Sequence, residues 1–240
     1  MNRRGALFSL GAMAAAAATP VRALEMKGYP TDMSMDPAFL PRPAIHGGSF
    51  QVLTADIDRR TVTAVFDRLI PADDLGASAS EAGCVEFLDM QLAGPFGEGA
   101  SLYRKGPKLP NEDELAQTPQ FIETPRERYA TGLAALEAFA QKTEGASFAD
   151  LPEPRQDAIL KGMEDGTVDL GPDVNTKAFF ELMLINVREG YFSDPIYGGN
   201  KDMVGWKMIG FPGARYDYRL YADRTGEDLG LEPVSLIPRD

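Results

Sequence analysis

The feature that most constrains the fold is a helical segment that is apolar nearly all the way round. It begins near Asn175 and ends at Asp194-Pro195, because proline lacks an amide donor and disfavours helical geometry in the residue before it. Apolar side chains occupy every turn, at Phe179, Phe180, Leu182, Met183, Leu184, Ile185 and Val187. Such a helix needs partners on all sides, so we expect it in the middle of a bundle.

Four other segments are predicted to supply the surrounding helices. They cover about 55–70, 80–92, a stretch that begins at Thr124-Pro125, and 154–164. The third has the clearest start, because Thr124, Pro125 and Glu127 match a capping box with proline at the first helical position. Thr54 is the predicted N-cap of the first helix. The prediction is an all-α, mostly helical fold: an irregular bundle of about five helices with long loops and extended N- and C-terminal arms.

The chain divides into four regions. Residues 24–54 are rich in proline, methionine and glycine and lack periodicity, which indicates an extended arm before a helical domain over 55–213. Within that domain, 94–123 is a loop far longer than usual, and such loops are often functional. Residues 214–240 change character again and are predicted to be a C-terminal arm.

Residues 1–23 have the pattern of an export signal. Adjacent arginines, Arg3 and Arg4, precede a short alanine-rich apolar run, and Ala23 closes a small-residue cleavage site; no acid occurs in this segment. The arginine pair favours the twin-arginine (Tat) route over an ordinary secretory signal. The run is too short for a permanent membrane anchor, which needs about 20 residues. We therefore expect a periplasmic protein.

Composition excludes several classes of partner and site. The chain has 24 basic and 36 acidic residues, and loss of Arg3, Arg4 and Arg22 with the signal leaves 21 basic residues and a net charge of −15. Nucleic acid is therefore an unfavourable partner.

Cys84 is the only cysteine, so it forms no internal disulfide and is expected to be a buried free thiol rather than a bridge to another chain. No haem-attachment motif, dinucleotide-binding glycine motif or histidine cluster occurs, and His46 is the only histidine.

The stretch from 189 to 213 is predicted to be a rigid, shaped bend. Gly198-Gly199-Asn200 permits positive φ, Trp206 is the only tryptophan, and a second turn follows at 210–213. We expect Phe192 and Trp206 mostly inside, with Tyr191 and Tyr197 nearer a contact surface.

Three other interpretations of this bend remain open. Glu189, Asp194 and Asp202 are close in sequence and could serve a carboxylate-based enzyme. Asp194, Asn200 and Asp202 offer oxygen ligands for calcium, but they match no helix–loop–helix calcium loop. An aromatic pocket near Trp206 would suit a stand-alone protein that binds a small ligand such as a sugar. The structural interpretation is stronger for the acids, since Asp194 before a proline forms turns.

The run from Gly190 to Gly213 resembles the signature of the small subunit (subunit 3, or gamma) of gluconate 2-dehydrogenase and related membrane-bound FAD-dependent sugar dehydrogenases. The resemblance extends upstream in the expected order. It includes Leu69-Ile70-Pro71-Ala72-Asp73-Asp74, the helix with Phe87 and Asp89, Ala116-Gln117-Thr118-Pro119, and Thr124-Pro125-Arg126-Glu127-Arg128-Tyr129. It covers about residues 55–213 and leaves both arms uncovered.

The resemblance implies a heterotrimer in which this chain is not an enzyme on its own. A flavoprotein large subunit of the glucose-methanol-choline type would hold FAD and oxidise the sugar, and a multi-haem cytochrome c subunit would hold haem c. This chain, without a cofactor, would carry the export signal to the Tat translocon and support maturation of the large subunit. We expect partner contacts among six residues of the bend: Tyr191, Asp194, Tyr197, Asn200, Lys201 and Trp206.

Overall fold

The structure, a computed structural model, describes residues 42–102, 122–215 and 217–237. All of these lie in one compact unit, Pro41–Asp240. The predicted export signal with Arg3, Arg4 and Ala23, residues 24–41 of the N-terminal arm and residues 103–121 of the long loop lie outside the described residues.

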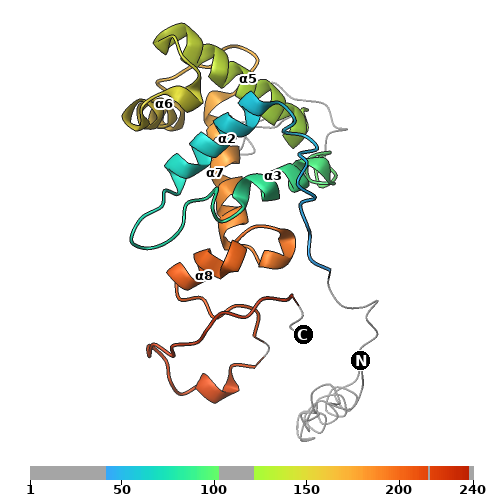
Figure 1. Cartoon of the computed structure of the whole chain (residues 1–240), viewed down its shortest axis with the longest axis vertical. Coiled ribbons are helices and arrows are strands. Elements are labelled where there is room, and N and C mark those ends of the chain that lie inside the picture. Colours follow the sequence, from blue (N-terminus) through green and yellow to red (C-terminus); the bar gives the residue numbers. More distant parts are fainter. Residues whose placement is uncertain (1–41, 103–121, 216, 238–240) are drawn as a thin grey trace, which may run out of the picture. The chain divides into compact units, whose positions relative to one another are not determined.

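The regular structure of the described residues is helical, without a strand, so the predicted all-α fold is confirmed (Figure 1). Two isolated β-bridges join Asp73 to Gly76 and Gly213 to Val234. The α-helices are α2 (Asp56–Leu69), α3 (Cys84–Ala93), α5 (Pro125–Glu144), α6 (Glu153–Asp165), α7 (Thr176–Phe192) and the short α8 (Val204–Met208). Single 3-10 turns are η2 (Phe148–Asp150), η3 (Pro195–Tyr197), η4 (Lys201–Met203) and η5 (Arg219–Tyr221).

Helix α7 is the central element, as its composition predicts. It contacts α2, α3, α5, α6 and α8, and Figure 1 shows it passing between the others. Its buried side chains include Phe179, Phe180, Met183 and Val187, while Ile185 is 49% exposed. One side of α7 therefore reaches the surface, although the helix is apolar nearly all round.

Helix α5 packs closely against α7. The predicted capping box is present, since the Thr124 side chain accepts from the Glu127 N–H while the Glu127 carboxylate accepts from the Thr124 N–H. A Cβ at Gly132 would lie 2.5 Å from the Phe179 ring, so glycine permits the close approach of the two helices. The buried Tyr129 hydroxyl donates to Asn186 Oδ1 at 3.0 Å, which fixes their register.

The starts of α2 and α3 differ from the prediction. Ala55 occupies the N-cap position of α2 with no side-chain cap, so the prediction that Thr54 caps this helix is wrong. The Arg59 guanidinium instead donates to the carbonyl oxygens of Leu53 and Thr54. Helix α3 begins at Cys84 rather than near residue 80, because Gly83 at φ 80° ends a series of turns before it.

Helix α6 is joined to α2 by ion pairs at the surface. The Arg68 guanidinium lies 2.6 Å from Glu153 and 2.7 Å from Asp157, both on α6. Exposed pairs of this kind contribute little stability, so they align the helices more than they hold them. Among the described helices, none has the length and apolar character that crossing a membrane requires.

Candidate functional site

Residues 193–206, here called the junction, close the C-terminal end of α7. The last carbonyl groups of a helix have no partner within it and must be satisfied by other groups. The Asn200 amide donates to the Ser193 carbonyl at 2.8 Å, and Trp206 Nε1 donates to the Phe192 carbonyl at 2.7 Å. The Asn200 amide oxygen also accepts from the Gly205 N–H at 2.8 Å. These two side chains therefore cap α7 and attach α8 to it.

Two glycines let the junction approach α7 closely. A Cβ at Gly199 would lie 2.2 Å from the Gly190 carbonyl oxygen, and one at Gly205 would lie 2.0 Å from the Tyr191 carbonyl oxygen. Neither distance is possible for a side chain facing rigid backbone, so both positions require glycine.

The backbone of the junction is strained at three non-glycine positions of positive φ within four residues. Asn200 has φ 47°, Asp202 φ 56° and Met203 φ 57°. Asparagine and aspartate tolerate this region, whereas methionine rarely enters it. The surrounding hydrogen bonds of Asn200 hold this conformation in place.

Asp194 holds the C-terminal segment. Its carboxylate accepts from the Ile196 N–H at 2.9 Å, from the Ser235 hydroxyl at 2.7 Å and from the Leu236 N–H at 2.8 Å. The side chain is buried, so its charge is stabilised by these donors rather than by water. Residues 234–236 are thereby fixed against the junction, alongside the bridge between Gly213 and Val234.

The end of α7 and the junction also contact the loop between α2 and α3 and the N-terminal segment. The Tyr191 hydroxyl donates to the Ala77 carbonyl at 2.6 Å, and the Lys201 N–H donates to the Ala82 carbonyl at 3.0 Å. The Ala44 N–H donates to the Ile196 carbonyl at 2.6 Å. Segments that are far apart in the sequence therefore meet at the end of α7.

The six residues expected at the partner interface divide into two groups. Asp194, Asn200 and Trp206 are buried and engaged in the internal hydrogen bonds described above. Tyr191 is 0% exposed, so the prediction that it lies nearer the surface is wrong; its ring packs edge-to-face on Phe192 and its hydroxyl binds Ala77.

Tyr197 and Lys201 form the second group. The Tyr197 side chain is 53% exposed, as predicted, and Lys201 is also exposed. The interior position predicted for Trp206 is confirmed, with Phe192 partly buried beside it.

The acids of the proposed catalytic or calcium sites have different surroundings. Asp194 is buried with three donors, whereas Asp202 is exposed on η4. Glu189, on α7, accepts from the Asn186 amide at 3.0 Å. Within the described ranges, no group of three or more His, Cys, Asp or Glu side chains could hold a metal ion.

Asp89 is a structural residue that reasoning from the sequence did not assign. It is 0% exposed on α3, and its carboxylate accepts from the N–H groups of Gln51, Val52 and Leu53 at 2.8–2.9 Å. His46 Nε2 lies 3.5 Å from the same carboxylate. Asp89 therefore attaches the end of the N-terminal arm to the bundle, in the way that Asp194 attaches the C-terminal segment.

A sequence model described as gluconate 2-dehydrogenase subunit 3 matches residues 56–213. The chain belongs to the gluconate 2-dehydrogenase subunit 3 family. No curated protein and no solved structure matches it.

The match to the subunit 3 family spans the six α-helices of the described residues and the whole junction. It includes Asp89 and Asp194 but excludes the segments that these two carboxylates bind, residues 51–53 and 235–236. The region matched by the family therefore contains one carboxylate that binds the segment before it and one that binds the segment after it.

Cys84 of this subunit 3 protein lies in the core at the start of α3. It is a free thiol with 0% exposure, as predicted, and burial raises its pKa to about 12. At neutral pH the protonated thiol is a poor nucleophile and a poor metal ligand, so Cys84 behaves as a small apolar core residue.

Proposed function

We propose that this protein is the non-catalytic small subunit of a periplasmic, membrane-associated, FAD-dependent sugar or sugar-acid dehydrogenase. It carries the Tat export signal and supports export, maturation and stability of a flavoprotein large subunit of the glucose-methanol-choline type. FAD and haem c belong to the partners, the second of which is a multi-haem cytochrome c. The observation that carries this proposal is the family match over 56–213.

The chemistry of the junction supports a structural role. Asp194, Asn200 and Trp206 use their polar atoms to join α7, α8 and the C-terminal segment. An acid–base catalyst needs a group that can reach substrate, and a buried carboxylate with three protein donors is poorly suited to that task. The same bonds make the junction rigid, which favours a preformed contact surface.

The exposed side chains of the junction are the proposed contact points. Tyr197 and Lys201 are exposed on η3 and η4. The hydrogen bonds of the buried residues Asp194 and Asn200 fix the backbone of these two turns. Tyrosine is enriched among residues that dominate binding energy at interfaces. We propose that Tyr191, Asp194, Asn200 and Trp206 act on the partner indirectly, by shaping this surface.

A carboxylate-based enzyme and a sugar-binding protein are the rival functions. Trp206 is 5% exposed, stacks edge-to-face on Phe211 at 5.2 Å and donates to Phe192, so its ring is occupied by the protein itself. These contacts favour the subunit over a sugar site at Trp206. Turnover by the purified chain, lost in Asp194→Asn, would favour the enzyme instead.

Replacement of Arg3-Arg4 by two lysines tests the carrier role. We expect the flavoprotein large subunit to remain in the cytoplasm and periplasmic dehydrogenase activity to disappear, because the Tat route requires the arginine pair. Arg22→Lys, a change of the same kind outside the pair, is the matched control and should leave export intact. Fractionation followed by flavin and activity assays measures both. Unchanged periplasmic activity in the double-lysine variant would contradict the proposal.

A further inference from the structure

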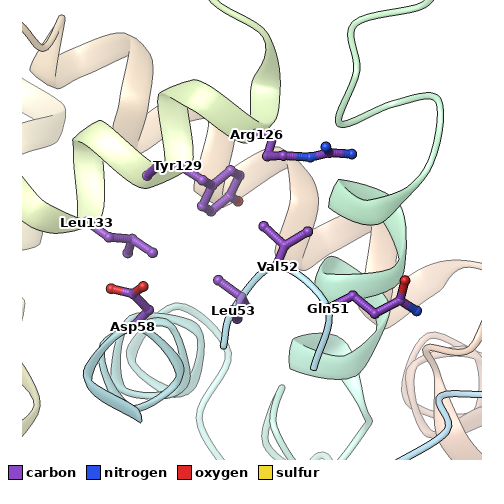
Figure 2. Close-up of a pocket in the computed structure, with 8 residues that line it drawn as sticks. Gln51, Val52, Leu53, Asp58, Arg126, Tyr129 and Leu133 are labelled. Atoms are coloured by element: carbon purple, nitrogen blue, oxygen red, sulfur yellow. The ribbon is translucent and has the colours of Figure 1, made fainter. Parts of the chain in front are cut away.

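A cavity of about 330 Å³ lies between α2, α5 and the end of the N-terminal arm, away from the junction. Val52 and Leu53 line it from the arm, Asp58 from α2, and Tyr129, Ala130 and Leu133 from α5. Figure 2 shows the Asp58 carboxylate and the Leu133 side chain pointing toward one another, with the Tyr129 ring beside them. The size is at the lower limit for a ligand pocket and suits a single long side chain.

The walls of this cavity are fixed before any ligand arrives. Asp89 holds the backbone of Val52 and Leu53, while the capping box of Thr124 and Glu127 sets the first turn of α5. Preformed walls reduce the ordering cost of binding. Most of the lining is apolar, so the cavity favours a ligand with a hydrocarbon portion.

Two of the polar side chains at the cavity already make hydrogen bonds within the protein. The Arg126 guanidinium donates to the carbonyl oxygens of Leu92 and Ala93 at the end of α3. The Tyr129 hydroxyl donates to Asn186 in the core. Asp58 differs, because none of the residues that the structure describes donates a hydrogen bond to its half-buried carboxylate.

The surroundings of Asp58 make a cationic ligand favourable. Burial raises the pKa of Asp58, the neighbouring Arg59 opposes this effect, and the carboxylate of Glu137 adds to it. A carboxylate that burial and a like charge destabilise gains stability when a cation approaches it.

We propose that this cavity receives a lysine or arginine side chain of the flavoprotein large subunit. The alkyl stem would lie against Val52, Tyr129 and Leu133, and the charged group would pair with Asp58. Lysine and arginine combine such a stem with a terminal cation, which matches a cavity whose lining is mostly apolar and whose one carboxylate is that of Asp58. The charge of −15 expected after signal removal favours a basic partner surface. This inference rests on the proposed function, because it names the contact that the small subunit makes.

Asp58→Asn tests the pairing, with Asp56→Asn as its control. Both changes remove one negative charge from the first turn of α2, but the Asp56 side chain is 75% exposed and pairs with Arg59. We expect Asp58→Asn to raise the Kd between the mature chain and the large subunit by about tenfold and to reduce its dependence on salt. Asp56→Asn should change Kd by less than about threefold.

Ala130→Phe tests the cavity itself, with Ala138→Phe as its control. Both alanines are exposed on α5, but only Ala130 lines the cavity. A phenyl ring at 130 should occupy the space and weaken the complex by about tenfold, whereas a ring at 138 should not. In the large subunit, the occupant is the lysine or arginine whose change to methionine weakens binding to the wild-type chain but has no additional effect in the Asp58→Asn background.

The outcomes separate this inference from the proposed function. A wild-type complex whose affinity and salt dependence are unchanged by Asp58→Asn and by Ala130→Phe overturns the cavity contact and leaves the subunit role intact. Failure of the wild-type chain to bind the large subunit overturns both.

Discussion

At the scale of single residues, Asp89 and Asp194 have the same task at different places in the fold. Each is a buried carboxylate that accepts three hydrogen bonds. The donors to Asp89 are the N–H groups of residues 51–53, and those to Asp194 lie at Ile196, Ser235 and Leu236. A buried charge without such donors is strongly destabilising, and backbone N–H groups left without an acceptor are costly as well. The two aspartates therefore select one position for the segments they bind.

Asp89→Asn should lower the free energy of unfolding by about 3 kcal/mol, because an amide turns one N–H₂ group toward backbone donors that need acceptors. Urea unfolding followed by circular dichroism measures the change, and limited proteolysis should show earlier cleavage within 42–53. Asp74→Asn, at an exposed aspartate, is the control and should change stability by less than about 0.5 kcal/mol. Equal effects of the two changes would contradict the role assigned to Asp89.

The role of Asp89 could not be predicted from the sequence. Local patterns give helices and turns, whereas the donors to Asp89 are 36–38 residues away along the chain. The one available signal was that Asp89 lies among the apolar residues of α3, next to Leu88. That position indicates burial, but it does not indicate which groups donate hydrogen bonds to the carboxylate. For the same reason Tyr191 was misplaced, since its acceptor, Ala77, is 114 residues away.

At the scale of elements, the sequence pattern predicted the helices themselves well, but it predicted only some of their ends correctly. Proline at 195 ends α7 as predicted, and the Thr124 capping box starts α5. Thr124 is followed three residues later by a glutamate, and Thr54 is not. Near Thr54, the Arg59 guanidinium donates to the carbonyl oxygens of Leu53 and Thr54. The end of α7 was predictable, but its caps, Asn200 and Trp206, depend on how the chain returns after the bend.

This difference between the two threonines is testable. Thr124→Ala should lower the free energy of unfolding by about 1 kcal/mol, because the α5 N-terminus loses its side-chain acceptor. Thr54→Ala, with no cap to lose, should lower it by less than about 0.3 kcal/mol. Chemical denaturation of both variants measures this. A loss at Thr54 as large as that at Thr124 would mean that Thr54 stabilises α2 in some other way.

At the scale of the whole molecule, the family region and its flanking segments are joined by few, specific bonds. The match ends at Gly213, yet residues 234–236 return to the junction through Asp194 and the Gly213–Val234 bridge. The helical bundle does not depend on the C-terminal segment for its core, since the buried apolar cluster extends from Leu53 to Tyr191.

Deletion of 214–240 should therefore leave a folded helical protein that is less stable by about 2 kcal/mol, because Asp194 loses two of its three donors. Helical circular dichroism and urea unfolding measure both parts of this expectation. Asp194→Asn should then cost less in the shortened chain than in the full chain. Complete unfolding on truncation would show that the C-terminal segment belongs to the core.

The position of the single tryptophan has a practical consequence. Trp206 is 5% exposed where the end of α7, α8 and the turn before the C-terminal segment meet. All indole emission from the protein therefore comes from one place. A red shift of that emission reports water reaching the end of α7, so the chain contains its own optical probe of the region where its distant segments come together.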